Sequence, residues 1–234
     1  MSLKTRLIGA SALRWCGSAL ALPVLLVTWY VVAQPSLSAL QAQLVERFGA
    51  ARSGLLHDWG RMLAQARNAG EEKKLVLVND FFNKHIVFDE DISTWQQADY
   101  WATPLETIGQ GRGDCEDFAI AKYFSLRMSG LPISKMRLVY VKAQLTGSGG
   151  ELTQRAHMVL AYYSRPQAEP LVLDNLQNTI QPASKRRDLQ PVFSFNSEAI
   201  FAGVSGVEPP SAGKLGRLSR WENLLQRARA EGFD

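Results

Sequence analysis

The spacing of hydrophobic residues changes once along this 234-residue chain, at Gly130-Leu131-Pro132. Upstream, apolar residues recur at three- and four-residue intervals, which predicts helices. Downstream, short runs rich in Val, Leu, Tyr and Phe are separated by turn-forming segments, which predicts strands. We expect helices over 36–83 and 114–128, and strands over 137–143, 157–163, 171–174 and 192–195. Helices followed by a meander of strands are typical of an α+β fold with an antiparallel sheet.

Two segments fit this division less simply. Residues 84–112 show no clear period and contain Pro104 and glycines, so we expect a long structured loop there. Residues 215–230 form a basic amphipathic pattern whose apolar face carries four side chains, Leu218, Trp221, Leu224 and Leu225. A helix docked on the domain is favoured over a helix on a membrane surface.

The first 33 residues have the features of an export signal. Their only charges are Lys4, Arg6 and Arg14, and an apolar stretch follows these basic residues. Val31-Val32-Ala33 offers a cleavage site with a small final residue. An uncleaved signal anchor is the alternative, because about 20 apolar residues can span a bilayer. Either interpretation predicts a single domain over 34–234 that lies outside the cytoplasm, in the periplasm.

The charge of the remaining chain argues against nucleic acid as a partner. From Gln34 onward, 23 basic residues face 22 acidic ones, and no segment concentrates Lys and Arg on one face. Proteins that bind nucleic acid present such a basic face.

Cys115 occupies a position that suits a nucleophile. It stands in the segment GRGDCEDF, where glycines lead into the helix expected from Asp114. A helix N-terminus stabilises a thiolate, and its free backbone N–H groups can bind an oxyanion. Gln110 is a further candidate for oxyanion binding, by proximity alone. Cys16, the only other cysteine, lies in the leader, so the exported chain would carry one thiol and no internal disulfide.

His157 and Asp174 provide the partners that such a thiol needs. His157 begins one expected strand and Asp174 ends the next. A turn centred between Arg165 and Pro166 would place the two residues directly opposite each other, on one face of the sheet. A carboxylate beside an imidazole fixes its tautomer, so that the ring can activate a thiol. The order Cys115, His157, Asp174 therefore predicts a nucleophile, a base and an orienting acid.

Several motifs together resemble a known family. The segments WATPLE, GQGRGDCEDFAIAKYFSLR, RAHMVLAYY and LVLDNL resemble the bacterial transglutaminase-like cysteine proteases of the LapG type, over roughly 74–196. The resemblance implies a papain/transglutaminase-like core, with N-terminal helices and the nucleophile helix packed on an antiparallel sheet. It also implies the triad roles given above. As substrate it implies a large surface adhesin, cut near its N-terminus in the periplasm so that cells leave a biofilm, and as inhibitory partner an inner-membrane cyclic-di-GMP receptor.

The acidic residues around Cys115 raise the question of a metal. Asp114, Glu116 and Asp117 would oppose ionisation of the thiol unless a positive charge neutralised them. Carboxylate oxygens suit Ca²⁺, whereas scattered histidines and a single thiol do not suit zinc. The resemblance implies that calcium binds at these three residues. The other acidic run, Asp89-Glu90-Asp91, is expected to be a solvated loop.

Two alternatives to proteolysis remain open at this stage. The same three residues serve acyl transfer to an amine in transglutaminases, since only the acceptor differs. A catalytically silent binding module that has kept the fold is the other alternative.

Overall fold

The computed structural model describes residues 36–147, 149–202 and 219–233. The expected leader and its cleavage site lie outside these residues. No helix among them combines the length and hydropathy needed to cross a membrane.

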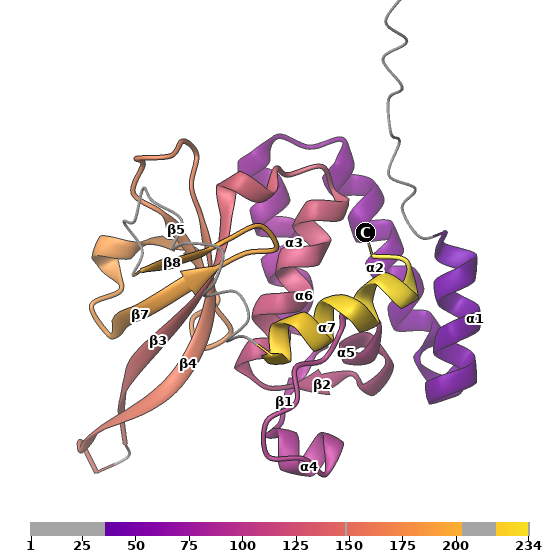
Figure 1. Ribbon diagram of the computed structural model, residues 1–234, viewed down its shortest axis with the longest axis horizontal. Helices are drawn as coiled ribbons and strands as arrows, with labels where there is room; N and C mark the ends of the chain where they lie inside the picture. Colours follow the sequence, from indigo (N-terminus) through magenta and orange to yellow (C-terminus); the bar gives the residue numbers. More distant parts are fainter. Residues whose placement is uncertain (1–35, 148, 203–218, 234) are drawn as a thin grey trace, which may run out of the picture. The chain divides into compact units, whose positions relative to one another are not determined.

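Helices form the first half of the described chain, as the hydrophobic spacing predicts. They are α1 (Leu37–Phe48), α2 (Ser53–Arg67), α3 (Glu71–His85) and α6 (Cys115–Met128). Helix α6 packs against α2, α3 and two strands of the sheet, and Figure 1 shows it between the sheet and these helices. Because it is covered on all sides, eleven of its fourteen residues are buried. The helix that begins at Cys115 is therefore the centre of the core.

The second half forms a six-stranded sheet in which every neighbouring pair is antiparallel. Its order is β6-β5-β4-β3-β7-β8. The strands are β3 (Met136–Thr146), β4 (Leu152–Tyr162), β5 (Leu171–Leu173), β6 (Gln181–Pro182), β7 (Leu189–Phe195) and β8 (Ile200–Ala202). Strands β6 and β8 had no counterpart in the predicted pattern. The expected α+β class, with the nucleophile helix packed on an antiparallel sheet, is confirmed.

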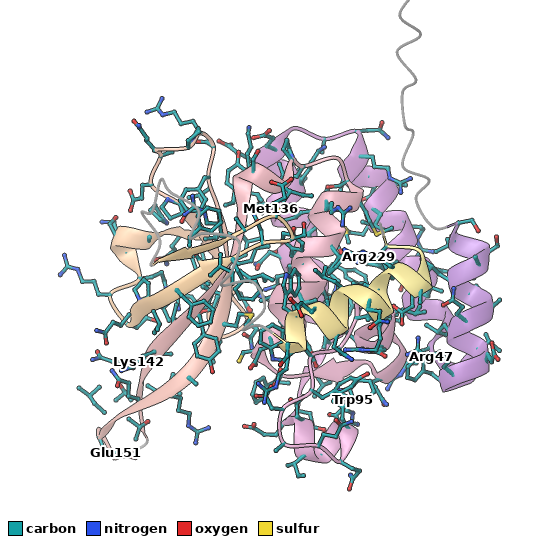
Figure 2. All side chains as sticks on the ribbon, in the orientation of Figure 1. Arg47, Trp95, Met136, Lys142, Glu151 and Arg229 are labelled. Atoms are coloured by element: carbon teal, nitrogen blue, oxygen red, sulfur yellow. The ribbon has the colours of Figure 1, made fainter. Side chains whose placement is uncertain are left out.

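Strands β3 and β4 form a long hairpin that extends past the helices. Their pairing runs from Met136 opposite Tyr162 to Thr146 opposite Leu152. Figure 2 shows Glu151 at the free end of this hairpin and Lys142 further along β3. Ala143 of β3 and Ala156 and His157 of β4 line one pocket with Cys115 at the N-terminus of α6.

The expected long loop over residues 84–112 is wrong. This segment contains β1 (Val87–Phe88), α4 (Asp91–Trp95) and α5 (Pro104–Gln110), and β1 pairs in parallel with β2 (Arg112–Gly113). These elements are too short to produce a visible hydrophobic period. Helix α5 nevertheless had a readable start signal, because Thr103 and Glu106 form a capping box with proline at the first helical position.

The C-terminal helix is docked on the domain, as its apolar face predicts. Helix α7 (Ser219–Glu231) buries Trp221 and Leu224, and Leu225 is partly buried against the same core. Residues 215–218 of the expected helix, Leu218 among them, lie outside the described residues.

Candidate active site

The chain enters α6 through a strongly constrained turn. Backbone N–H groups of Val87 and Asp89 on the β1 side donate to the carbonyls of Gly111 and Gly113, 3.1 and 3.0 Å away. Asp114 is the N-cap of α6, and its side chain accepts a hydrogen bond from the N–H of Glu116 at 3.2 Å. Cys115 is thus the first residue of the helix, where backbone N–H groups lack intrahelical partners.

The thiol of Cys115 has an acidic neighbour. Its Sγ lies 2.7 Å from Oε2 of Glu116, a distance at which the thiol donates to the carboxylate. Burial raises the pKa of Cys115, and the charges of Glu116 and Asp114 raise it further, whereas the backbone N–H of Met158 acts in the opposite direction. Burial and the neighbouring acidic groups therefore favour the protonated thiol when no cation is bound.

His157 and Asp174 are joined by a hydrogen bond of 2.8 Å between Nε2 and Oδ1. The expected direct opposition of the two residues is wrong by two positions, because Leu160 pairs with Leu173 and Tyr162 with Leu171. A shift of two residues keeps both side chains on the same face of the sheet, since side chains alternate with a period of two. The contact is therefore diagonal, between β4 and the residue that follows β5.

Arg186 is a partner of Asp174 that no sequence pattern predicts. Its Nη2 lies 2.6 Å from Oδ2 of Asp174, and both side chains are almost fully buried. Asp188 holds the same guanidinium from another side, with contacts of 3.0 and 2.7 Å. Burial alone would raise the pKa of Asp174, but His157 and Arg186 together lower it to about 2. Asp174 is therefore ionised near neutral pH, with one oxygen for the imidazole and the other for Arg186.

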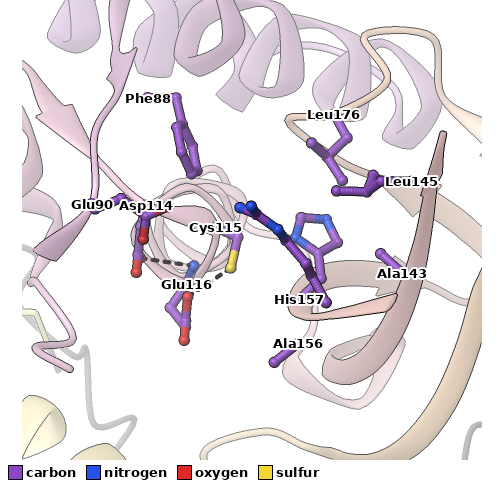
Figure 3. Close-up of a pocket in the computed structure, with 11 residues that line it drawn as sticks. Phe88, Glu90, Asp114, Cys115, Glu116, Ala143, Leu145, Ala156, His157 and Leu176 are labelled. Atoms are coloured by element: carbon purple, nitrogen blue, oxygen red, sulfur yellow. Dashed lines mark hydrogen bonds between the residues drawn. The ribbon is translucent and has the colours of Figure 1, made fainter. Parts of the chain in front are cut away.

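Cys115 and His157 share one pocket of about 420 Å³. Figure 3 shows them on facing sides of it. No hydrogen bond joins the thiol to the ring, and Nδ1 of His157 has no hydrogen-bond partner among the described residues. The rest of the lining combines five apolar side chains, Phe88, Ala143, Leu145, Ala156 and Leu176, with four charged ones, Glu90, Asp114, Glu116 and Arg155. Gln110 is not among these lining residues.

A second acidic cluster lies beside the pocket, and it corrects the expectation of a solvated loop at residues 89–91. Asp91 is the first residue of α4 and only 5% exposed. Ligand atoms of Asp91, Asp114 and Asp117 lie within 4.8 Å of one another. Asp91 was missed because the β1–β2 pairing and α4, which bring it to Asp114 and Asp117, were not predicted.

The chemistry of this cluster fits a hard cation. Oδ1 of Asp117 accepts the N–H of Ala102 at 2.7 Å, but Oδ2 of Asp117 and Oδ1 of Asp91 are buried without a partner among the described residues. A Cβ added to Gly113 would approach Oδ2 of Asp117 to 2.5 Å, so only glycine leaves this oxygen uncovered. Buried carboxylate oxygens without donors are costly unless protonated or bound to a cation.

Protonation of this cluster is favoured when no cation is bound. Burial is the main cause that raises the pKa of Asp91 to about 6, and it also raises the pKa of Asp114 and Asp117, with the neighbouring carboxylates adding to each shift. Glu116, the third predicted ligand, has a different position. Its carboxylate contacts Cys115 and lies in the group formed by Asp114, Cys115 and Glu116. Asp91, Asp114 and Asp117 thus form one cluster of carboxylates. Glu116 lies outside it, next to Asp114 and in contact with the thiol of Cys115.

Comparison with known proteins gives one consistent result. Residues 60–187 match the family described as bacterial transglutaminase-like cysteine proteinase BTLCP. Among solved structures, the chain is similar to LapG of Legionella pneumophila, with 34% identity over 83% of this chain and 99% of that chain and a TM-score of 0.66. Calcium-bound and EGTA-treated forms of Legionella pneumophila LapG match at 34% and 33% identity, each with a TM-score of 0.68. They cover 82% and 83% of this chain, and 98% and 99% of their own.

No curated protein sequence matches the chain. The family match and the structural matches nevertheless confirm the resemblance inferred from the motifs around Cys115, His157 and Asp174. The chain therefore belongs to the bacterial transglutaminase-like cysteine proteinases and is a cysteine protease.

Proposed function

We propose that this protein is a calcium-dependent periplasmic endopeptidase that cuts a large surface adhesin near its N-terminus and so releases cells from a biofilm. The observation that carries the proposal is the shared pocket, in which Cys115 at the N-terminus of α6 faces an imidazole held by Asp174. The substrate class, the periplasmic location and inhibition by an inner-membrane cyclic-di-GMP receptor are supported by family membership.

In the proposed reaction, His157 takes the thiol proton on Nδ1 while Nε2 remains bonded to Asp174. The thiolate attacks the carbonyl carbon of the scissile peptide bond, and the backbone N–H of Cys115 stabilises the resulting oxyanion. The imidazolium then protonates the leaving amine, and water hydrolyses the thioester. Asp174 stays ionised throughout because Arg186 holds its other oxygen.

Asp91, Asp114 and Asp117 are proposed to hold calcium, with Glu116 as a further ligand. The bound ion would supply positive charge that offsets the carboxylates around the thiol. Calcium is favoured over magnesium because it accepts many oxygen ligands in flexible geometry. The similarity of this chain to calcium-bound and EGTA-treated forms of Legionella pneumophila LapG supports this assignment.

The proposal is tested with purified wild-type protein and a Cys115→Ser variant, each incubated in calcium with surface proteins released from the host cells. We expect one large protein to be shortened by wild type and left intact by Cys115→Ser, as measured by electrophoresis and N-terminal sequencing. A parallel incubation contains a glutamine peptide and a labelled amine. Label incorporation without chain scission would favour acyl transfer. Absence of both, with Cys115 alkylated no faster than a free peptide thiol, would favour the silent binding module.

Replacing Asp174 with asparagine is expected to lower kcat/KM by about a hundredfold in a protein that still folds. Arg186 only donates hydrogen bonds, so it would bind the amide oxygen and turn the NH₂ group towards Nε2 of His157. Nε2 must then accept, which moves the ring proton to Nδ1, the atom that has to take the thiol proton. The measurement is kcat/KM together with a thermal melt.

Asp188→Asn is the matched control for this variant. Asp188 contacts the same guanidinium, but its side chain is 42% exposed and it has no contact with His157 among the described residues. We expect its kcat/KM to stay within about threefold of wild type. If Asp174→Asn has the same kcat/KM as wild type, Asp174 does not orient His157 in the reaction.

A further inference from the structure

Lys122 is a charged residue in the middle of the core. It lies on α6 two turns after Cys115, and it is 1% exposed. Its Nζ donates to Oδ1 of Asn79 at 2.9 Å and to the backbone carbonyl of Asp174 at 3.0 Å. Burial lowers its pKa to about 7, although the charges of Asp174 and Asp80 oppose this shift. Both contacts need only N–H donors, so the neutral amine makes them as well.

Two asparagines of α3 extend the same network to the segment after β5. Nδ2 of Asn83 donates to the carbonyl of Asp174 at 2.8 Å and to Oδ1 of Asn178 at 3.1 Å. Nδ2 of Asn79 donates to the carbonyl of Asn178 at 2.7 Å. The segment Asp174–Asn178 is therefore held at its first residue and at its last by side chains of α3 and α6.

The held segment carries two parts of the active site. Asp174, at its start, bonds to the imidazole of His157. The N–H of Leu176 donates to Oδ1 of Asp174 at 3.1 Å, and Leu176 lines the pocket that contains Cys115. The position of this segment thus fixes the acid of the proposed triad and one wall of the pocket at once.

Stability gives little reason for a lysine at this position. An ammonium group is costly to bury without solvent, whereas an unbranched apolar side chain of similar length avoids that cost. If Lys122 were apolar, the carbonyl of Asp174 would keep Asn83 as a donor, and Oδ1 of Asn79 would lose its hydrogen bond to Lys122. Lys122 does provide a hydrogen bond from α6, which carries Cys115, to Asp174, which orients His157.

We infer that Lys122 is a positioning residue for the reaction. By holding the carbonyl of Asp174, it ties α6 to the His157–Asp174 pair and sets the place of the imidazole relative to Cys115. This inference rests on the proposed proteolytic function, and on Asp174 as the group through which Lys122 acts. Small displacements of reacting groups lower catalytic rates strongly, because the attack needs a defined geometry.

The test is Lys122→Met, which keeps the length of the stem and removes the donors. We expect kcat to fall by about thirtyfold, with KM changed by less than about threefold. The melting temperature should fall by no more than about 5 °C. In an Asp174→Asn background, Lys122→Met should lower kcat by less than about twofold more, because the carboxylate that Lys122 positions against His157 is already lost.

Lys135→Met is the matched control. Lys135 forms an ion pair with Glu71 at 2.7 Å, and neither residue is among those that line the pocket. This variant should keep the kcat of wild type. The inference is overturned if Lys122→Met keeps the kcat of wild type. It is also overturned if Lys122→Met lowers kcat as much in the Asp174→Asn background as in wild type.

Should Lys122→Met fail to fold, Asn83→Ala removes the other donor to the backbone carbonyl of Asp174. It should lower kcat by about threefold, with the same non-additivity, and an unchanged kcat overturns the inference.

A measurement without protein substrate separates this inference from the proposed function. The rate at which iodoacetamide alkylates Cys115 is followed by mass spectrometry in wild type, His157→Ala and Lys122→Met. Slower alkylation in both variants than in wild type supports the positioning role, whether or not an adhesin is cleaved. Failure to cleave any adhesin would overturn the proposed function and leave this result standing. Equal alkylation of wild type and Lys122→Met overturns the positioning role.

Discussion

Replacing His157 with alanine is expected to lower kcat/KM for peptide cleavage by about a thousandfold or more. The imidazole is the group in the pocket that can take the thiol proton, and in this structure that thiol donates to Glu116. Without the ring, the thiol has an elevated pKa and no base to ionise it. The measurement is steady-state cleavage of a peptide that spans the site found in the adhesin.

Cys115→Ser and the double variant extend this test. Cys115→Ser should lose activity to a similar extent, because a hydroxyl ionises far less readily than a thiol. The double variant should be no worse than either single variant, since residues that act as a unit are not additive. Arg155→Ala is the control, as Arg155 lines the same pocket from an exposed position on β4. Its effect should fall mainly on KM. A fully active His157→Ala protein would exclude the proposed base.

The pairing of His157 with Asp174 shows what a sequence can predict about a site. Strand alternation predicts that the two residues share a face, and the structure places them there. Their register was wrong by two residues because the hydrophobic pattern does not locate the centre of the turn between β4 and β5. Since a shift of two preserves the face, the error did not separate the side chains.

Arg186 and Asp91 show where this kind of prediction stops. Arg186 lies in an irregular segment and Asp91 begins the short helix α4, and each joins its site through contacts with another element. Lys122 is a different case, because helical spacing places it on the same side of α6 as Cys115. Helical spacing does not predict that this side of α6 faces the segment Asp174–Asn178 rather than solvent.

The second large effect concerns calcium, which we expect to stabilise the protein strongly near pH 7.5 and much less near pH 5. In the metal-free protein, the carboxyl groups of Asp91, Asp114 and Asp117 have raised pKa values, about 6 for Asp91. An unfolded chain loses the same protons near pH 4, so the metal-free fold loses stability as the pH rises from about 4 through 6 and above. Calcium replaces these protons as the neutralising charge.

Thermal melts with calcium and with EGTA, at pH 5 and pH 7.5, measure this effect. The gap in melting temperature between calcium and EGTA should be larger at pH 7.5, and at that pH EGTA should abolish cleavage until calcium is restored. Magnesium should restore less, because it demands a smaller and more regular shell of oxygens. Titration calorimetry in two buffers of different ionisation enthalpy should show protons released as calcium binds.

Asp91→Asn and Asp89→Asn form the matched pair that locates the ion. Asp91 contributes a buried oxygen to the cluster, whereas Asp89, two residues away, forms an ion pair with Arg112 at 2.8 Å. Asp91→Asn should raise the calcium concentration needed for half-maximal cleavage about tenfold, because the ion loses one of its charged ligands. Asp89→Asn should leave that concentration nearly unchanged. If both variants respond to calcium as wild type does, Asp91 is not a ligand. If calorimetry detects no calcium binding and EGTA changes neither rate nor melting temperature, the carboxylates serve only to start α4 and α6.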